Sequence, residues 1–226
     1  MYYVCGDPAQ LPPVSKDEDN HLLDEPHIFL DEIMRQAEES EIIQLTMKIR
    51  AQEKIQEQKG EEVQVYSKNE LTDGMLTWAN QVLCATNKTR QDLNIHMRQL
   101  QGRGDNPEIG DKIICLKNEW ERESDCGNPL INGTIGYITN IKSEDIYVPF
   151  YLKLPIKFFR IFTIDFETET GEKFFNIPID RNMLLFGEPT LDFKTAYILS
   201  RTKIKNKLPI EFAFGYAITT HKAQRK

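Results

Sequence analysis

The sequence has no apolar run long enough to cross a membrane, and its net charge is −7. A spanning helix needs about 20 consecutive apolar residues. No signal-peptide pattern precedes the first apolar stretch, so we expect a cytoplasmic protein without a membrane partner. The negative net charge argues against nonspecific nucleic-acid contacts over the whole surface.

Cysteine is scarce and forms no paired motif. The four cysteines, Cys5, Cys84, Cys115 and Cys126, include no C-x-x-C pair. Such spacing is typical of free thiols in a reducing compartment. A zinc site would need histidines to approach these cysteines by folding alone, so we expect no metal ligands.

The first residues predict a strand followed by a stiff loop. Residues 2–5 are apolar or aromatic, Gly6-Asp7-Pro8 ends the run, and Pro12-Pro13 prevents an immediate helix. Asp7 and Gln10 would therefore lie at the carboxyl end of a strand, where open α/β sheets bind ligands. The alternative is a proline-rich surface turn after an edge strand.

The run G-D-P-A-Q-L-P-P-V at residues 6–14 resembles motif III of superfamily 1 DNA helicases of the RecD and Dda-like group. In that family the glutamine senses the γ-phosphate of ATP and couples it to the DNA track. The resemblance therefore implies ATP contacts for Asp7 and Gln10.

A second stretch, L-x-x-I-x-R-Q-x-x-x-S-x-I-I at residues 30–43, resembles motif IV of the same group. There the arginine reaches the γ-phosphate held on the neighbouring domain, which implies this role for Arg35. A fixed guanidinium suits the charge that develops on a transferred phosphoryl group. The alternative is a surface ion pair between Arg35 and a nearby carboxylate. Ser40 is the expected N-cap of a following amphipathic helix.

Residues 81–85 predict a second buried strand, and residues 91–100 predict a helix with Leu93, Met97 and Leu100 facing inward. The turn between them would place polar groups at a helix N-terminus, which favours anions. The run V-L-C-A-T-N-K-T-R-Q-D-L-N is similar to the family's turn near the DNA backbone. Thr86, Asn87 and Arg90 are therefore candidate phosphate contacts. Ordinary helix capping is the alternative, and it does not exclude the contact.

The last residues repeat the arrangement of an apolar strand followed by polar side chains. Residues 216–224 resemble motif V, Y-A-x-T-x-H-K-x-Q-G, with Arg225 in place of the final glycine. Hydroxyl, imidazole and ammonium groups at a strand end suit phosphate contacts. Thr220, His221 and Lys222 are therefore candidate nucleic-acid ligands, although a structural histidine is the alternative. We interpret the lysines at 203–207 as a solvated loop.

Residues 118–212 are rich in Ile, Phe, Tyr and Thr, with predicted breaks at Asp145, Pro149, Pro155, Gly171 and Pro178. This pattern predicts short antiparallel strands that close into a small barrel, with a hairpin turn at Asn132-Gly133. The pattern G-D-K-x-x-x-x-x-N followed by N-G-x-x-G resembles the entry to the family's SH3-like barrel. A free-standing oligonucleotide-binding barrel is the alternative.

Together these resemblances imply an α/β chain with three parts. Residues 1–14 would end a first RecA-like domain, and residues 15–117 and 213–226 would form an incomplete second RecA-like parallel-sheet domain. Residues 118–212 would be the inserted SH3-like β-barrel. The implied activity is that of an ATP-dependent DNA helicase, which uses ATP and Mg²⁺ to move along single-stranded DNA and has the remaining helicase domains as partners.

Several family signatures do not occur in the sequence. They are the G-x-x-x-x-G-K-[ST] loop, a preceding Asp-Glu pair and a motif VI arginine. We therefore expect a fragment that runs from motif III to motif V, without a bound cofactor or ATPase activity of its own. A non-enzymatic module that binds single-stranded nucleic acid or protein is the alternative, and an in-frame upstream G-K-[ST] loop would distinguish the two. A nuclease is less favoured, because no carboxylate cluster has metal-binding spacing.

Overall fold

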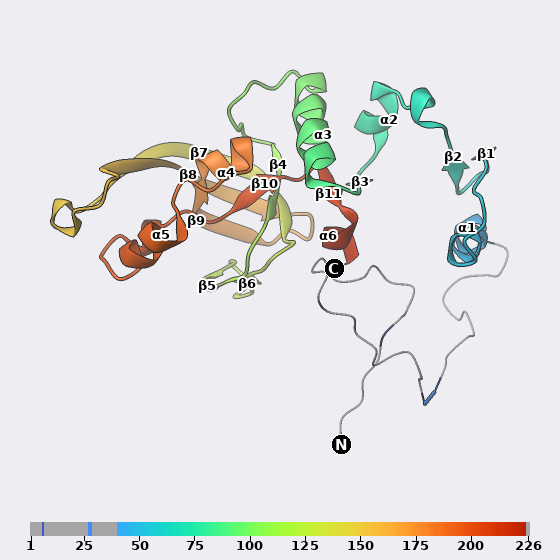
Figure 1. Ribbon diagram of the computed structural model, residues 1–226. Helices are drawn as coiled ribbons and strands as arrows, with labels where there is room; N and C mark the ends of the chain where they lie inside the picture. The colour runs from blue at the N-terminus through green and yellow to red at the C-terminus, as the bar shows by residue number, and fades with distance from the viewer. Residues whose placement is uncertain (1–5, 7–26, 29–39, 225–226) are drawn as a thin grey trace. The chain divides into compact units, whose positions relative to one another are not determined.

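A computed structural model describes residue 6, residues 27–28 and residues 40–224 of the chain (Figure 1). The chain divides into two compact units, Met1–Thr72 and Asp73–Lys226. The strand expected at residues 2–5 lies outside the described residues. The candidate residues Asp7, Gln10 and Arg35 lie outside them as well.

The described part of the first unit contains one helix and a small hairpin. The helix α1 spans Glu41–Arg50, strands β1 and β2 span Gln58–Lys59 and Gln64–Val65, and the 3₁₀ turn η2 spans Lys68–Glu70. Ser40 precedes α1 as predicted. Its hydroxyl donates to Glu62 Oε2 at 2.9 Å instead of capping the helix. Glu41 accepts hydrogen bonds from the N–H groups of Glu62 and Val63, at 2.9 and 3.0 Å.

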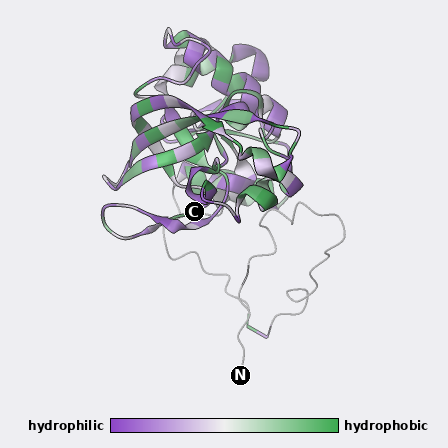
Figure 2. Cartoon of the chain, turned by 90° about the vertical axis from the view of Figure 1, so that its left-hand side faces the viewer, coloured by the Kyte–Doolittle hydropathy of each residue, from purple (hydrophilic) through white to green (hydrophobic). Residues whose placement is uncertain are grey.

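The second unit is built around a five-stranded antiparallel sheet in the order β10-β4-β7-β8-β9. Its strands are β4 (Lys112–Cys115), β7 (Ile135–Tyr147), β8 (Phe158–Thr168), β9 (Lys173–Asp180) and β10 (Phe212–Phe214). Exposed and buried residues alternate along much of β8, whereas β4 and β10 are buried throughout; Figure 2 shows the hydropathy of each residue. Alternate side chains point to opposite faces of a sheet, so β8 has one buried face, and β4 and β10 are covered on both faces.

The core of the unit contains an aromatic group from three strands. Phe166 stacks on Phe174 with ring centroids 4.9 Å apart, and its ring meets that of Phe212 edge-on at 5.7 Å. All three side chains are fully buried. Offset and edge-to-face contacts are the favoured geometries for aromatic pairs. They hold β8, β9 and β10 to one another.

The two edges of this sheet approach each other just before β10. The Asp180 N–H donates to the Ile210 carbonyl, and the Ile210 N–H donates to the Pro178 carbonyl, both at 2.8 Å. Two residues later, β10 pairs with β4 at the opposite edge. The strands that the structure describes nevertheless form no closed barrel. The sheet also includes β4 and the last two residues of β10, which lie outside the residues 118–212 expected to form it.

The predicted antiparallel strands and the breaks at Pro149, Pro155 and Gly171 are confirmed, whereas the breaks predicted at Asp145 and Pro178 are wrong. Strand β7 continues through Asp145, whose carboxylate pairs with Arg160 on β8 at 2.6 Å. Strand β9 continues through Pro178, because an edge strand tolerates the missing N–H of proline.

The expected hairpin at Asn132-Gly133 is also wrong. Strand β6 (Pro129–Leu130) pairs with β5 (Glu119–Glu123), whereas β7 pairs with β4. The Gly133 N–H donates to the Cys115 carbonyl, so the turn leads the chain back to β4.

The remaining elements of this unit are helices and one parallel strand pair. Helices α2, α3, α4, α5 and α6 span Asp73–Trp78, Asn87–Leu100, Arg181–Phe186, Phe193–Leu199 and Thr220–Gln224, and the 3₁₀ turns η3 and η4 span Phe150–Leu152 and Lys205–Lys207. Strands β3 (Val82–Cys84) and β11 (Ala217–Thr219) form a separate parallel pair. The chain is thus of mixed α/β class. Among the described residues, no helix combines the length and apolar character needed to cross a membrane.

Candidate nucleic-acid interface

Two of the predicted polar turns begin at the same edge of the β3–β11 pair. The parallel register places Val82 opposite Ala217 and Cys84 opposite Thr219. Paired strands lie about 4.8 Å apart, so the residues that follow Cys84 and Thr219 start as neighbours. Helices α3 and α6 follow β3 and β11 directly (Figure 1). The structure therefore brings the Thr86 turn and the Thr220 turn together.

The N-terminus of α3 presents polar groups to solvent. The helix begins at Asn87, four residues earlier than predicted, because Thr86 is its N-cap. Thr86 Oγ1 accepts from the Thr89 N–H at 3.1 Å. The side chains of Asn87 and Lys88 are exposed, and the first turn contains no acidic residue. The first N–H groups of a helix have no carbonyl partner within it, so this end of α3 favours an anion.

Arg90 has a different environment from Thr86 and Asn87. It is 9% exposed, and its Nε is buried without a hydrogen-bond partner among the described residues. It lines a small cavity of about 20 Å³ with residues of α3, α4 and β10, including Asn94, Leu184 and Phe214. Burial lowers the pKa of Arg90. A surface phosphate contact would require its guanidinium to leave this cavity, and the predicted contact stays a prediction.

Thr220, His221 and Lys222 begin α6 and are half-buried. The Lys222 ammonium donates to the Leu116 carbonyl at 3.4 Å and to Asn132 Oδ1. These bonds tie the start of α6 to the end of β4 and to the turn before β7. Lys222 therefore has a structural contact in addition to any ligand that it binds.

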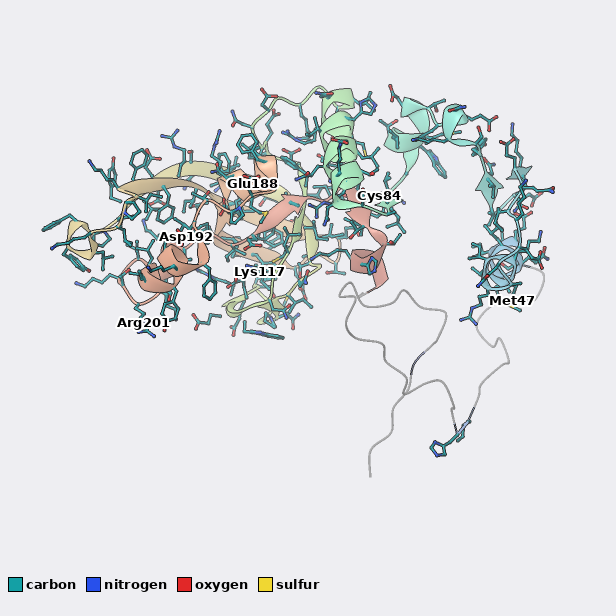
Figure 3. The ribbon with its side chains drawn as sticks, viewed as in Figure 1. Met47, Cys84, Lys117, Glu188, Asp192 and Arg201 are labelled. Carbon is teal, nitrogen blue, oxygen red and sulfur yellow. The ribbon has the colours of Figure 1, made fainter. Side chains whose placement is uncertain are left out.

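Cys84 lies where β3 ends beside α3 (Figure 3). Its thiol donates to the Ile218 carbonyl at 3.4 Å. Burial raises the pKa of this thiol. Cys84 thus acts as a small buried side chain that joins β3 to β11.

A side chain on α3 completes the hydrogen bonding of β11. Asn94 Nδ2 donates to the Ala217 carbonyl at 3.0 Å, and Asn94 Oδ1 accepts from the Ala217 N–H at 2.9 Å. Gln81 Nε2 donates to the carbonyls of Gly215 and Tyr216, at 3.1 and 3.0 Å. These two amide side chains fix the backbone that leads from β10 into β11, and so position the Thr220 turn.

A buried polar network holds α3 against the start of β4. Arg98 Nε and Nη2 donate to the two Asp111 carboxylate oxygens at 3.0 and 3.1 Å, and the Tyr216 hydroxyl donates to Asp111 Oδ1 at 2.9 Å. Asp111 is fully buried. The Arg98 guanidinium also lies 4.3 Å from the centroid of the Phe214 ring. Burial, and secondarily the Asp111 charge, raises the pKa of Tyr216 to about 12.

Sequence reasoning missed Asn94, Arg98 and Asp111. The available signal was the spacing of Arg90, Asn94 and Arg98, which recur every four residues and share one face of a helix. That face is buried together with Met97, whereas Leu100, predicted to face inward, is exposed. A face of mixed polar and apolar residues indicates that the helix covers backbone groups as well as side chains.

The surface lysines near residue 205 are paired with carboxylates. Lys205 contacts Glu121 at 3.0 Å, and Lys207 contacts Glu144. These pairs fit the interpretation of a solvated loop. In the described part of the chain, no group of three or more His, Cys, Asp or Glu side chains is placed to hold a metal ion.

No protein-family model matches the sequence, and no curated protein matches it.

Proposed function

We propose that the chain is part of an ATP-dependent DNA helicase of the RecD and Dda-like type. Its role in such a motor would be to hold single-stranded DNA at the carboxyl ends of β3 and β11. The observation that carries the proposal is the parallel register of Cys84 with Thr219. It brings together two turns that are far apart in sequence and that each resemble a DNA-contact motif of the family.

The chemistry of this edge suits a sugar-phosphate backbone. Phosphate oxygens accept hydrogen bonds from backbone N–H groups at helix N-termini and from hydroxyl groups, which here belong to α3 and Thr220. His221 adds a ring N–H, and the exposed Lys88 adds a cation. Such contacts position a strand without reading its sequence. They match a motor that moves along DNA of any sequence.

The proposal also assigns the finer architecture. Strands β3 and β11 would belong to an incomplete second RecA-like domain, and strands β7–β9 would form its SH3-like insertion, to whose sheet β4 and β10 are added from the flanking segments. The roles of Asp7, Gln10 and Arg35 toward ATP and Mg²⁺ rest on the sequence motifs alone. The motor would act in the cytoplasm together with the remaining helicase domains.

The proposal is tested by the affinity of the protein for labelled oligo-dT, measured by fluorescence anisotropy over a range of salt concentrations. Asn87→Asp places a negative charge at the N-terminus of α3, where it stabilises the helix but repels a phosphate. We expect unchanged or slightly higher stability and at least fivefold weaker DNA binding, equivalent to about 1 kcal/mol. Asn206→Asp, at an exposed asparagine of η4, is the matched control.

A second variant removes one candidate phosphate contact, and a parallel measurement of its stability separates an effect on binding from an effect on folding. Lys222→Ala should weaken binding and make the salt slope shallower by about 0.7, the value for one lost contact to a single strand. Because Lys222 also bonds to Leu116 and Asn132, its stability is measured in parallel. Lys142→Ala removes an exposed cation from β7 as a control. If Asn87→Asp and Lys222→Ala both bind as tightly as the unaltered chain, the β3–β11 edge is not the DNA site.

A binding module without a motor is the second candidate function. The near approach of the sheet edges at Ile210 favours it, because small barrel-like sheets bind single strands on their own. The two candidates differ in the sequence expected upstream of residue 1. An in-frame G-K-[ST] loop and Asp-Glu pair there support the motor, whereas their absence supports the module.

A further inference from the structure

The connection between β7 and β8 carries a group of exposed aromatic side chains. We call residues 147–158 the hairpin tip; it projects from the end of the sheet in Figure 1. Four of its rings are exposed: Tyr147 by 73%, Phe150 by 92%, Tyr151 by 63% and Phe158 by 49%. Soluble proteins seldom leave several large aromatic side chains exposed together unless they bind something.

These rings are held on an ordered frame. The Val148 N–H donates to the Lys157 carbonyl at 2.9 Å, and the Leu152 N–H donates to the Pro149 carbonyl at 3.1 Å. The aliphatic side chains of the tip pack into a cluster with Leu191 and Leu199: these are Val148, Leu152, Leu154 and Ile156. The tip therefore buries its aliphatic residues and presents its aromatic ones.

The exposed rings form two pairs. The rings of Tyr147 and Phe158 lie 6.0 Å apart with an angle of 39° between their planes. The rings of Phe150 and Tyr151 lie 6.3 Å apart at 75°. Each pair leaves ring surface open to solvent, to which a planar group can be added by stacking.

The hairpin tip is also locally cationic on an acidic chain. No Asp or Glu occurs between Ile146 and Ile164, whereas the whole chain has a net charge of −7. Lys153 and Lys157 are exposed, and their side chains have no ion pair or hydrogen bond to any residue that the structure describes. The cations farther along, Arg160 and Lys207, are by contrast paired with Asp145 and Glu144.

We propose that the hairpin tip is a second binding surface for single-stranded nucleic acid. Bases stack on the exposed rings, and Lys153 and Lys157 contact the phosphates. Interleaved aromatic and cationic side chains are the general means of holding unpaired strands. A protein partner fits less well, because lysine is depleted at the centres of protein interfaces.

This surface is separate from the β3–β11 edge. Tyr137 of β7 lies opposite Lys112 of β4, and Tyr147 is ten residues farther along the same strand. At 3.3 Å per residue, Tyr137 and Tyr147 are about 33 Å apart, and the hairpin tip and the β3–β11 pair lie at opposite ends of this unit in Figure 1. The inference does not rest on the proposed ATP-driven activity, and it adds a contact point remote from the edge.

The test compares oligo-dT binding by the full chain and its variants, again by anisotropy. We expect Phe150→Ala and Tyr151→Ala each to weaken binding by at least about fivefold, with an unchanged salt slope, since stacking releases no counterions. The double variant Lys153→Ala/Lys157→Ala should instead make the slope shallower by about 1.4. Trp120→Ala, at an exposed ring of β5, is the aromatic control and should bind normally.

Conservative variants separate stacking from general apolar contact. Phe150→Tyr keeps the ring and should retain binding, whereas Phe150→Leu keeps apolar surface without the ring and should lose it. Normal binding by Phe150→Leu would overturn the stacking proposal. Oligo-U in place of oligo-dT shows whether the surface accepts RNA. The affinity for duplex DNA, whose bases are not free to stack, should be unchanged by Phe150→Ala.

The outcome also distinguishes this proposal from the preceding one. If Asn87→Asp weakens binding and the hairpin-tip variants do not, the tip is not a nucleic-acid surface and the proposed DNA site at the β3–β11 edge is supported. If only the tip variants weaken binding, the hairpin tip is supported as a nucleic-acid surface and the proposed site at the β3–β11 edge is wrong. If no tip variant changes oligo-dT or oligo-U affinity but Phe150→Ala abolishes association with a protein, the surface is a protein docking site and our assignment is wrong.

Discussion

Asn94 and Ala217 exchange two hydrogen bonds of 3.0 and 2.9 Å, in which a side-chain amide takes the place of a neighbouring strand. Both groups are buried. The pair fixes β11 against α3 and so sets where the Thr220 turn begins. The contact joins the two motif runs of the candidate site, because Asn94 ends the first run and Ala217 lies in the second.

Replacing this amide should be costly. Asn94→Leu leaves the N–H and the carbonyl of Ala217 buried without partners, and each unsatisfied group costs about 1–3 kcal/mol, so we expect a loss of about 2–6 kcal/mol. Urea denaturation measures it. Asn140→Leu, at an exposed asparagine of β7, should cost much less. A loss below about 1 kcal/mol in Asn94→Leu would show that water or a backbone shift replaces the amide.

The Arg98–Asp111 pair gives a second prediction. Asp111→Asn removes the charge opposite a buried guanidinium, and breaking such a pair costs about 3–5 kcal/mol. The double variant Arg98→Met/Asp111→Asn should lose less than Asp111→Asn alone, because the buried guanidinium of Arg98 is removed with its partner; Arg103, which also contacts Asp111 at 3.5 Å, is partly exposed to solvent. A double-mutant cycle from denaturation curves measures the coupling. Strictly additive losses would contradict a direct interaction.

The turns of the candidate site could be predicted because each depends on local sequence. An apolar run that ends in Thr86-Asn87 or in Thr219-Thr220-His221 indicates a strand and its exit within a few residues. The parallel pairing of β3 with β11 then places both exits at one edge. Helix α1, with apolar residues at helical spacing after Ser40, was predicted for the same reason.

The supporting contacts could not be predicted because they join residues far apart in sequence. Nothing local indicates that Asn94 covers Ala217, or that Asp111 binds both Arg98 and Tyr216. The prediction of a strand break at Asp145 was wrong for a related reason. Asp145 is a poor strand residue alone, and it is accommodated because Arg160 lies opposite it on β8.

The burial of Tyr216 predicts a change in stability at high pH. Its pKa is raised to about 12, above the usual value of about 10. The neutral hydroxyl is therefore favoured by folding, and its contribution is complete below pH 10 and is lost as the pH rises toward 12. We expect the free energy of unfolding to fall over this interval. Tyr216→Phe should be less stable at neutral pH but should show a smaller fall.

Ultraviolet titration of tyrosinate provides an independent measurement. Tyr216 should ionise late in the unaltered protein, and this late component should be missing in Tyr216→Phe. Tyr147→Phe, at an exposed ring, serves as the control and should leave the late component in place. If the late component is lost in Tyr147→Phe instead, its assignment to Tyr216 is wrong.

The Glu41 carboxylate predicts an effect of acid on the first unit. Hydrogen bonds from the N–H groups of Val63, Glu62 and Glu61 lower the pKa of Glu41. Gly60 leaves room for this carboxylate, because a Cβ at Gly60 would overlap it. Because the pKa of Glu41 is lowered by folding, this carboxylate contributes to stability at any pH above the usual carboxyl pKa. The contribution is lost as the pH falls through the lower pKa of the folded chain.

We therefore expect the amide protons of Glu62 and Val63 to exchange faster as the pH falls below the usual carboxyl range, after correction for the intrinsic exchange rate. Glu41→Gln should show fast exchange at neutral pH and little further change in acid, because its amide carries no charge to lose. Glu57→Gln, at an exposed carboxylate of the same unit, should behave like the unaltered chain. If Glu41→Gln protects these amides as well as the unaltered chain does, the Glu41 carboxylate does not hold the β1–β2 turn in place.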